Sequence, residues 1–281
     1  MRFMLAGILA LLIPFTGTAQ ETQSSPTGWI KEAVGNLNIT QVSFSNWTQG
    51  GENTFAWQII VNTKFSRKGE KLNWTTSGKF SFGKAKLGKS QFRKSVDEIK
   101  LESVLTYRLG KHVNPFLAAT MLTQFTDGFV YTDTSRTKIS DFLDPGYFTQ
   151  SVGLAAAPFS TMKIRLGFAF KETVTRNFPA PYADDPATPE LETIRFEVGM
   201  NSAMELSQKL SETVRLESKL ALFSNLKSIK EVDVNWDSLI SASISRLVNV
   251  NFNFRLIYDR NVSPKRQIKQ SLAVGFTYTF F

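Results

Sequence analysis

Charged side chains recur at every second position in several stretches of an otherwise apolar sequence. Lys163 and Arg165, for example, alternate with Ile164 and Leu166. A period of two is that of a β-strand, so the charges of each stretch share one face. If neighbouring strands enclose that face, it becomes a polar lumen, which either conducts solutes or is closed by ion pairs. The candidates for lumen-facing charges are Glu98, Lys100, Glu102, Arg108, Lys163, Arg165, Arg195, Glu197, Arg215, Glu217, Lys219 and Arg255.

The signs of these charges leave two interpretations of the lumen open. The basic residues Lys163, Arg165, Arg195 and Arg215 fall on three neighbouring predicted strands, and in an open pore such a cluster favours anions. The four glutamates of the set can instead neutralise the basic residues across strands. Every basic strand but one carries acidic residues within two positions or on its neighbour, which favours a closed or narrow lumen.

The sequence contains few residues that could catalyse a reaction. The chain has 281 residues, no cysteine and one histidine, His112. This histidine falls in a predicted short turn, Gly110 to Asn114, far from the end where a lipid-hydrolysing barrel would meet its substrate. In two of the longer predicted loops, the spacing of the acidic residues does not match that of an ordered Ca²⁺-binding loop. We therefore predict a protein that is not an enzyme, with no catalytic, cofactor-binding or metal-ligating residues and no cofactor.

The strands that must position the charges are long. Between Val248 and Asp259, five apolar residues interleave with polar ones, and comparable segments run through most of the chain. A tilted strand needs about ten residues to cross a hydrocarbon core, whereas soluble strands average about five or six. We count about twelve strands, near residues 36–46, 55–65, 72–82, 98–109, 113–126, 147–158, 162–171, 194–205, 213–222, 231–246, 248–259 and at the C-terminus.

The connections between strands alternate between short and long, which is typical of a bacterial outer-membrane barrel. If the N-terminus is periplasmic, an even strand count puts every short turn and the C-terminus on the periplasmic side. The fold class predicted is therefore all-β, a single antiparallel transmembrane β-barrel of about twelve strands with periplasmic termini, over residues 36–281. The alternative is a secreted soluble β-barrel or sandwich that acts as a binding module.

The N-terminus has the pattern of a cleaved signal peptide. Arg2 precedes an apolar stretch from Met4 to Phe15, and Gly17-Thr18-Ala19 supplies the small residues of a cleavage site. We predict a signal peptide over residues 1–19 and a periplasmic segment over residues 20–35. No later apolar run is long enough for a transmembrane helix, so the predicted location is the outer membrane.

The C-terminal strand and the outer loops suggest partners. Apolar residues alternate up to Phe280, and this aromatic ending resembles the signal that the barrel-assembly machinery recognises, although the final Phe281 lies in the polar register. Basic residues in the predicted outer loops, including Lys84, Lys86 and Arg93, suit lipopolysaccharide phosphates. Outer-membrane lipid, lipopolysaccharide and the barrel-assembly machinery are the expected partners. Nucleic acid is not expected, and the oligomeric state is left open.

One stretch resembles a known family. Asn46, Trp47, Gly50, Gly51 and Asn53 form the pattern Asn-Trp-x-x-Gly-Gly-x-Asn between two predicted strands. This pattern resembles the hallmark of a Bacteroidota outer-membrane β-barrel family of unknown function. The resemblance implies an outer-membrane protein without an assigned activity. In physical terms, the two glycines permit positive φ in a tight outer turn, and the two asparagines can close it by side-chain hydrogen bonds.

Overall fold

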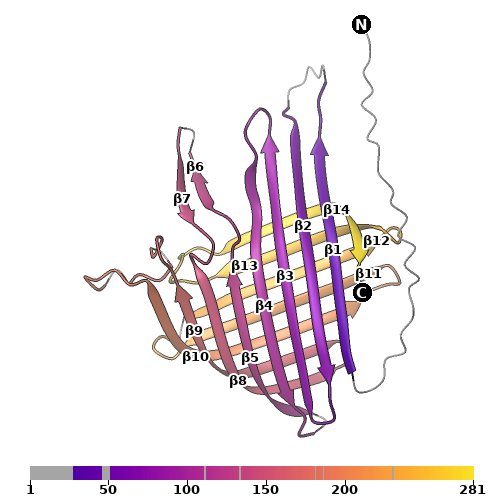
Figure 1. Cartoon of the computed structure of the whole chain (residues 1–281), viewed down its shortest axis with the longest axis vertical. Coiled ribbons are helices and arrows are strands. Elements are labelled where there is room, and N and C mark those ends of the chain that lie inside the picture. The colour runs from indigo at the N-terminus through magenta and orange to yellow at the C-terminus, as the bar shows by residue number, and fades with distance from the viewer. Residues whose placement is uncertain are drawn as a thin grey trace.

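A closed antiparallel barrel of twelve strands forms the body of the chain in a computed structural model (Figure 1). The structure describes residues 28–45, 51–110, 112–132, 134–180, 182–185, 187–229 and 231–281. Around the wall the strands follow the order β1-β14-β13-β12-β11-β10-β9-β8-β5-β4-β3-β2, and β6 and β7 form a separate two-stranded sheet. The predicted all-β barrel of about twelve strands is confirmed.

The wall strands run over eleven to sixteen residues, as the sequence pattern indicates. Their bounds are β1 (Gly28–Val42), β2 (Thr54–Lys68), β3 (Leu72–Leu87), β4 (Arg93–Tyr107), β5 (Val113–Thr123), β8 (Gly146–Phe159), β9 (Met162–Val174), β10 (Ile194–Lys209), β11 (Val214–Asn225), β12 (Val232–Ser243), β13 (Val248–Tyr258) and β14 (Gln267–Thr279).

Two features of the strands differ from the sequence prediction. The first strand begins at Gly28 and pairs with β2 from Gly28↔Lys68 onward, so the barrel starts upstream of the predicted boundary at residue 36. Its first part carries the charged Lys31 and Glu32, which hides the apolar alternation. The predicted long loop after β5 contains the hairpin of β6 (Gly128–Tyr131) and β7 (Arg136–Ser140). The predicted signal peptide, residues 1–19, lies outside the described residues.

The two faces of each strand meet different surroundings. On β14, Leu272, Val274, Phe276 and Tyr278 are exposed on the outside, and Phe276 keeps 51% of its surface accessible. Gly275, in the opposite register, is buried among asparagine side chains of β1 and β13. An apolar exterior around a polar interior is the reverse of a soluble protein. The alternative of a soluble β-barrel or sandwich is therefore wrong.

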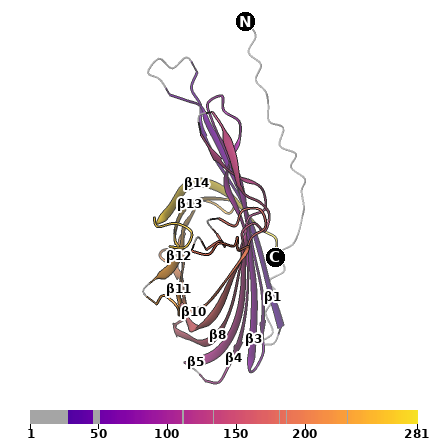
Figure 2. The ribbon, with the colours of Figure 1, turned by 90° about the vertical axis from the view of Figure 1, so that its left-hand side faces the viewer.

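Short turns lie at one end of the barrel and long connections at the other. Short turns follow β2, β4, β8, β10 and β12, and the strand ends nearest both chain termini lie at that end. The β6–β7 hairpin and the longer loops lie at the opposite end, which we call the outer end. The outer ends of β1 to β4 rise above β13 and β14 in both views, so the wall is higher on this side (Figure 2).

Candidate functional site: the barrel lumen

Ion pairs join strands on opposite sides of the lumen. Glu102 on β4 contacts Arg165 on β9 at 2.6 Å and also pairs with Lys219 on β11. Both cations contact Glu205 on β10 at 2.9 Å. Four strands separate β4 from β11 along the shorter way around the wall. We call Glu102, Arg165, Glu205 and Lys219 the central cluster. Side chains from opposite walls meet in it directly.

A second group, which we call the upper cluster, crosses the lumen between other strands. Glu98 on β4 pairs with Arg255 on β13, and Lys79 on β3 lies 3.2 Å from Asp237 on β12. Lys79 also contacts Glu98 at 3.3 Å, which joins the two pairs. Four strands separate the partners in each cross-lumen pair. This cluster spans the lumen a second time.

The third group, the mouth cluster, lies toward the outer end. Lys171 contacts Asp233 at 2.6 Å, Asp259 at 2.9 Å and Glu197 at 3.4 Å. The other oxygen of Glu197 accepts hydrogen bonds from Asn225 Nδ2 and Asn261 Nδ2. The Glu197 side chain is only 5% exposed. One lysine therefore holds three carboxylates together.

Aromatic rings take up part of the remaining space, and Gly199 leaves room for one of them. Phe116 is 3% exposed and lies 5.8 Å from the Arg165 guanidinium, while Phe223 lies 5.4 Å from Lys171 Nζ. A Cβ on Gly199 would lie 2.6 Å from the Phe223 ring. The interior of a twelve-stranded barrel is wider than that of a small barrel filled by side chains and narrower than that of a large barrel with a water-filled channel. Here charged side chains and rings occupy this interior.

The predicted lumen charges divide into three groups. Glu98, Glu102, Arg165, Glu197, Lys219 and Arg255 belong to the clusters just described. Lys100 shares their face of β4, and Arg195 donates from Nη2 to the Asp184 carbonyl oxygen at 2.8 Å. Lys163, Arg215 and Glu217 are exposed toward the periplasmic end, and Arg108 lies beyond the end of β4. The clusters thus gather half of the predicted set.

Sequence reasoning missed six charged residues of the clusters. These residues are Lys79, Lys171, Glu205, Asp233, Asp237 and Asp259. Most follow the same alternation as the predicted charges, so the signal was present. What the sequence lacks is the pairing between distant strands, because alternation gives the face of a residue and not its height in the barrel.

A cavity of about 450 Å³ opens beside the mouth cluster. Glu197 and Asp233 of the mouth cluster line it, together with charged residues of both signs from the outer loops. In one of these loops, Thr188 Oγ1 donates a hydrogen bond to Glu192, which lowers the pKa of that carboxyl below its usual value. The cavity therefore lies between the outer loops and the mouth cluster.

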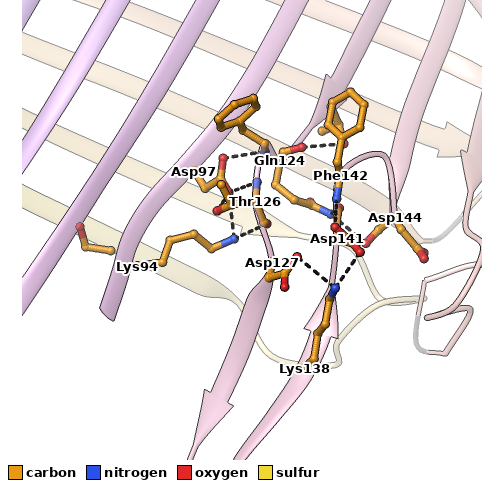
Figure 3. A network of polar contacts seen from close by, with 12 residues as sticks. Lys94, Asp97, Gln124, Thr126, Asp127, Lys138, Asp141, Phe142 and Asp144 are labelled. Carbon is orange, nitrogen blue, oxygen red and sulfur yellow. Dashed lines mark hydrogen bonds and ion pairs between the residues drawn. The ribbon is translucent and has the colours of Figure 1, made fainter. Parts of the chain in front are cut away.

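The long loop after β5 is fixed to the wall by Asp97 (Figure 3). Asp97 accepts hydrogen bonds from the backbone nitrogens of Phe125 and Thr126, at 2.7 and 2.8 Å, and pairs with Lys94 at 2.9 Å. Gln124 Nε2 donates to the carbonyl oxygens of Asp141 and Asp144. The base of the β6–β7 hairpin is thus held from both sides.

Lys138 joins the hairpin to its own base. Its Nζ lies 2.7 Å from Asp141 and 3.0 Å from Asp127. The hydrogen bond from Lys138 lowers the pKa of the Asp141 carboxyl, and the same bond raises the pKa of Lys138. The group is exposed, so water and salt screen this interaction.

Two of the five hallmark residues, Gly51 and Asn53, are described, and both shape the backbone of the turn. Gly51 has φ +130°, and the backbone nitrogen of Phe44 donates to Asn53 Oδ1 at 2.6 Å. A Cβ on Gly51 would also meet the Phe44 ring at 2.7 Å. Asn46, Trp47 and Gly50 lie outside the described residues.

Other functional sites are not evident in the described ranges. His112 lies exposed in the turn between β4 and β5, at the periplasmic end. Within the described ranges, no group of three or more His, Asp or Glu side chains could hold a metal ion. Among the described segments, no helix has the length and apolar character needed to cross a membrane.

Comparisons with known proteins add one family match. The model of a family described as "Protein of unknown function (DUF3078)" matches residues 39–129, about a third of the chain. This range contains the hallmark turn. No curated protein matches the sequence.

Several solved outer-membrane structures are similar over most of their length. The COG4313 outer membrane channel from Pseudomonas putida F1 is 11% identical, with a TM-score of 0.42 over 92% of this chain and 97% of that one. The translocator domain of the autotransporter NalP from Neisseria meningitidis is 11% identical, with a TM-score of 0.37 over 92% and 90%. The KdgM porin in complex with disordered oligogalacturonate is 8% identical, with a TM-score of 0.36 over 89% and 99%.

The location of the chain follows from its own surface. A closed β-barrel leaves no strand edge unpaired in lipid, and its apolar exterior matches a hydrocarbon core. Strands of more than ten residues are long enough to cross that core when tilted. The chain is an outer-membrane β-barrel, as predicted.

Proposed function

We propose that this barrel has a structural or assembly role in the cell envelope and is not an enzyme. Its lumen is closed to solutes by cross-lumen ion pairs. The observation that carries the proposal is the central cluster, where Glu102 pairs with Lys219 across the lumen and with Arg165, from which β5 and β8 separate it along the wall. Contacts of this kind support a lumen that is closed at that height.

The upper cluster supports the same conclusion. It bridges the lumen between β4 and β13 and between β3 and β12. A charge in a narrow barrel is costly unless it is paired or hydrated. Two layers of paired charges satisfy this requirement without a water-filled channel.

A narrow, anion-favouring passive pore is the second candidate. It is favoured by the exposed Lys163 and Arg215 toward the periplasmic end of the lumen, since an excess of basic groups at a pore entrance attracts anions. In this case thermal motion of the long charged side chains would open a path past the clusters.

Biogenesis follows from the two ends of the chain. We propose that residues 1–19 are removed on export and that the barrel-assembly machinery recognises the aromatic exterior of β14, where Tyr278 packs against Phe280. Mass spectrometry of the protein purified from outer membranes should give a mature N-terminus at Gln20. Recovery in a carbonate-soluble fraction would contradict the membrane location.

Conductance of the purified protein in a planar bilayer separates the two candidate functions. The wild-type barrel should show conductance near zero. A matched variant with Glu102→Ala, Arg165→Ala, Glu205→Ala and Lys219→Ala removes the central cluster without leaving one of its charges unpaired, and it should conduct measurably more. A large, stable, anion-selective conductance of the wild-type protein would overturn the closed-lumen proposal in favour of the pore.

A further inference from the structure

Two lysines, Lys84 and Lys86, lie at the outer end of β3, and we call them the outer basic patch. Arg93 on β4 lies opposite Ala85 in the ladder, so it is on the other face of the wall, where its guanidinium is 4.3 Å from the centre of the Tyr131 ring. No ion pair joins Lys84 or Lys86 to a residue of the described ranges, whereas Lys94 pairs with Asp97. Glu52, on the loop before β2, is the acidic residue beside the patch, near Gly88. The patch therefore has an excess of positive charge.

Both lysines point away from the lumen. Lys84 lies opposite Trp57 and Lys86 opposite Phe55 in the β2–β3 ladder. Residues opposite each other in an antiparallel ladder share a face of the sheet. Trp57 packs on Phe82, in the outward register of β3. Lys84 and Lys86 therefore share the lipid-facing side of the wall.

Aromatic rings form the floor of the patch. Lys84 Nζ lies 5.8 Å from the centre of the Phe82 ring, and Lys86 Nζ lies 5.9 Å from that of Phe92. Phe92 in turn meets Phe55 edge to face at 6.1 Å, and it remains 46% exposed. Aromatic side chains that are partly buried and partly exposed to water are typical of the membrane interface.

The height of the patch matches the outer lipid headgroups. Along β2, Trp57 lies ten residues from Arg67, which is the ladder partner of Trp74. Ten residues of strand span about 34 Å, or about 25 Å along the barrel axis at a tilt of about 40°. The apolar band of outer-membrane barrels is about 25 Å tall. Trp74 and Trp57 therefore lie at its two borders. Lys84, the ladder partner of Trp57, lies at the outer border, and Lys86 lies two residues beyond it.

We propose that the outer basic patch binds the phosphate groups of the glycolipid in the outer leaflet, with the acyl chains of that lipid against the aromatic floor. The proposal rests on the outer-membrane location and specifies one of the expected partners. Lysine ammonium groups form charge-assisted hydrogen bonds to phosphate oxygens. The aromatic rings complement the acyl chains of such a lipid, and the cations complement its phosphorylated sugar headgroup.

The test uses the full-length barrel refolded in a neutral detergent. Binding of bisphosphorylated lipid A is measured for the wild type, for the variant K84Q/K86Q and for the control R67Q/K68Q. The control removes two exposed basic residues at the periplasmic end of β2. Heat-modifiability on a gel verifies that each variant is folded.

We expect the patch variant to bind lipid A at least tenfold more weakly than the wild type and the control. Lipid A stripped of its phosphates should bind weakly to all three proteins. The proposal is overturned if the patch variant binds like the control, or if dephosphorylated lipid A or phosphatidylglycerol binds the wild type as tightly as lipid A does. Conductance of the same preparation tests the closed lumen independently, because the patch lies outside it.

Discussion

Arg165 and Glu102 lie 2.6 Å apart, although β8 and β5 separate their strands in the barrel wall. The two side chains are 11% and 12% exposed, so the contact is largely shielded from water. A pair of this kind links two strands of the wall that are not neighbours and fills part of the space between them. The same contact thus affects both the stability of the barrel and the passage of solutes.

Replacement of Glu102 by alanine should destabilise the barrel strongly. Arg165 and Lys219 would then share Glu205 alone, and removal of one partner from a buried ionic group costs about 3 kcal/mol. Urea unfolding in detergent, followed by heat-modifiability, measures this loss. Glu217→Ala is the control, because Glu217 is exposed on the adjacent part of β11. Equal effects of the two substitutions would show that the central cluster stabilises the barrel no more than an exposed charge does.

Gly153→Ala should weaken the pairing of β8 with β9. A Cβ at this position would overlap the Leu166 carbonyl oxygen and the Gly167 Cα, which are backbone atoms that can move only if the two strands separate. We expect a loss of about 1–3 kcal/mol in the free energy of unfolding, as for other overpacked sites. In Gly110→Ala the added methyl group meets nothing within 4 Å, so this control should unfold like the wild type.

Asp97→Ala should release the base of the long outer loop. The backbone nitrogens of Phe125 and Thr126 would lose their acceptor, and Lys94 would lose its ion pair. Limited proteolysis of intact cells should cleave the β6–β7 hairpin at least several-fold faster than in the wild type. Glu212→Ala, in a turn at the other end, should leave the cleavage rate unchanged. An unchanged rate in the Asp97 variant would mean that the hairpin is held by other contacts.

Acid should loosen the β6–β7 hairpin. The pKa of Asp141 is lowered in the folded state by the hydrogen bond from Lys138, so its stabilising effect is complete above the ordinary carboxyl pKa of about 3.9. The effect is lost as the pH falls through the lower, folded-state value. Hydrogen exchange of residues 128–140, corrected for intrinsic rates, should therefore accelerate below about pH 4. In Asp141→Asn this acceleration should largely disappear, and its persistence would assign the pH dependence to another group.

The alternation of residues determined most of the fold. Leu272 to Phe280 and Val250 to Tyr258 each have one apolar and one polar face, and in the barrel these faces lie outside and inside. A period of two is a local property, so one sequence contains enough information to predict it. The alternation of short and long connections likewise determined which ends of the strands meet.

Only the tertiary structure decided which charges meet. Closing the wall brings Glu98 to Arg255 and Glu102 to Lys219, residues more than a hundred positions apart, because strand stagger sets the height of each side chain. The hairpin after β5 and the start of β1 at Gly28 also depend on partners distant from the local pattern. The sequence by itself therefore determined a charged interior and an apolar exterior, and the three-dimensional closure decided that the interior is crossed by ion pairs.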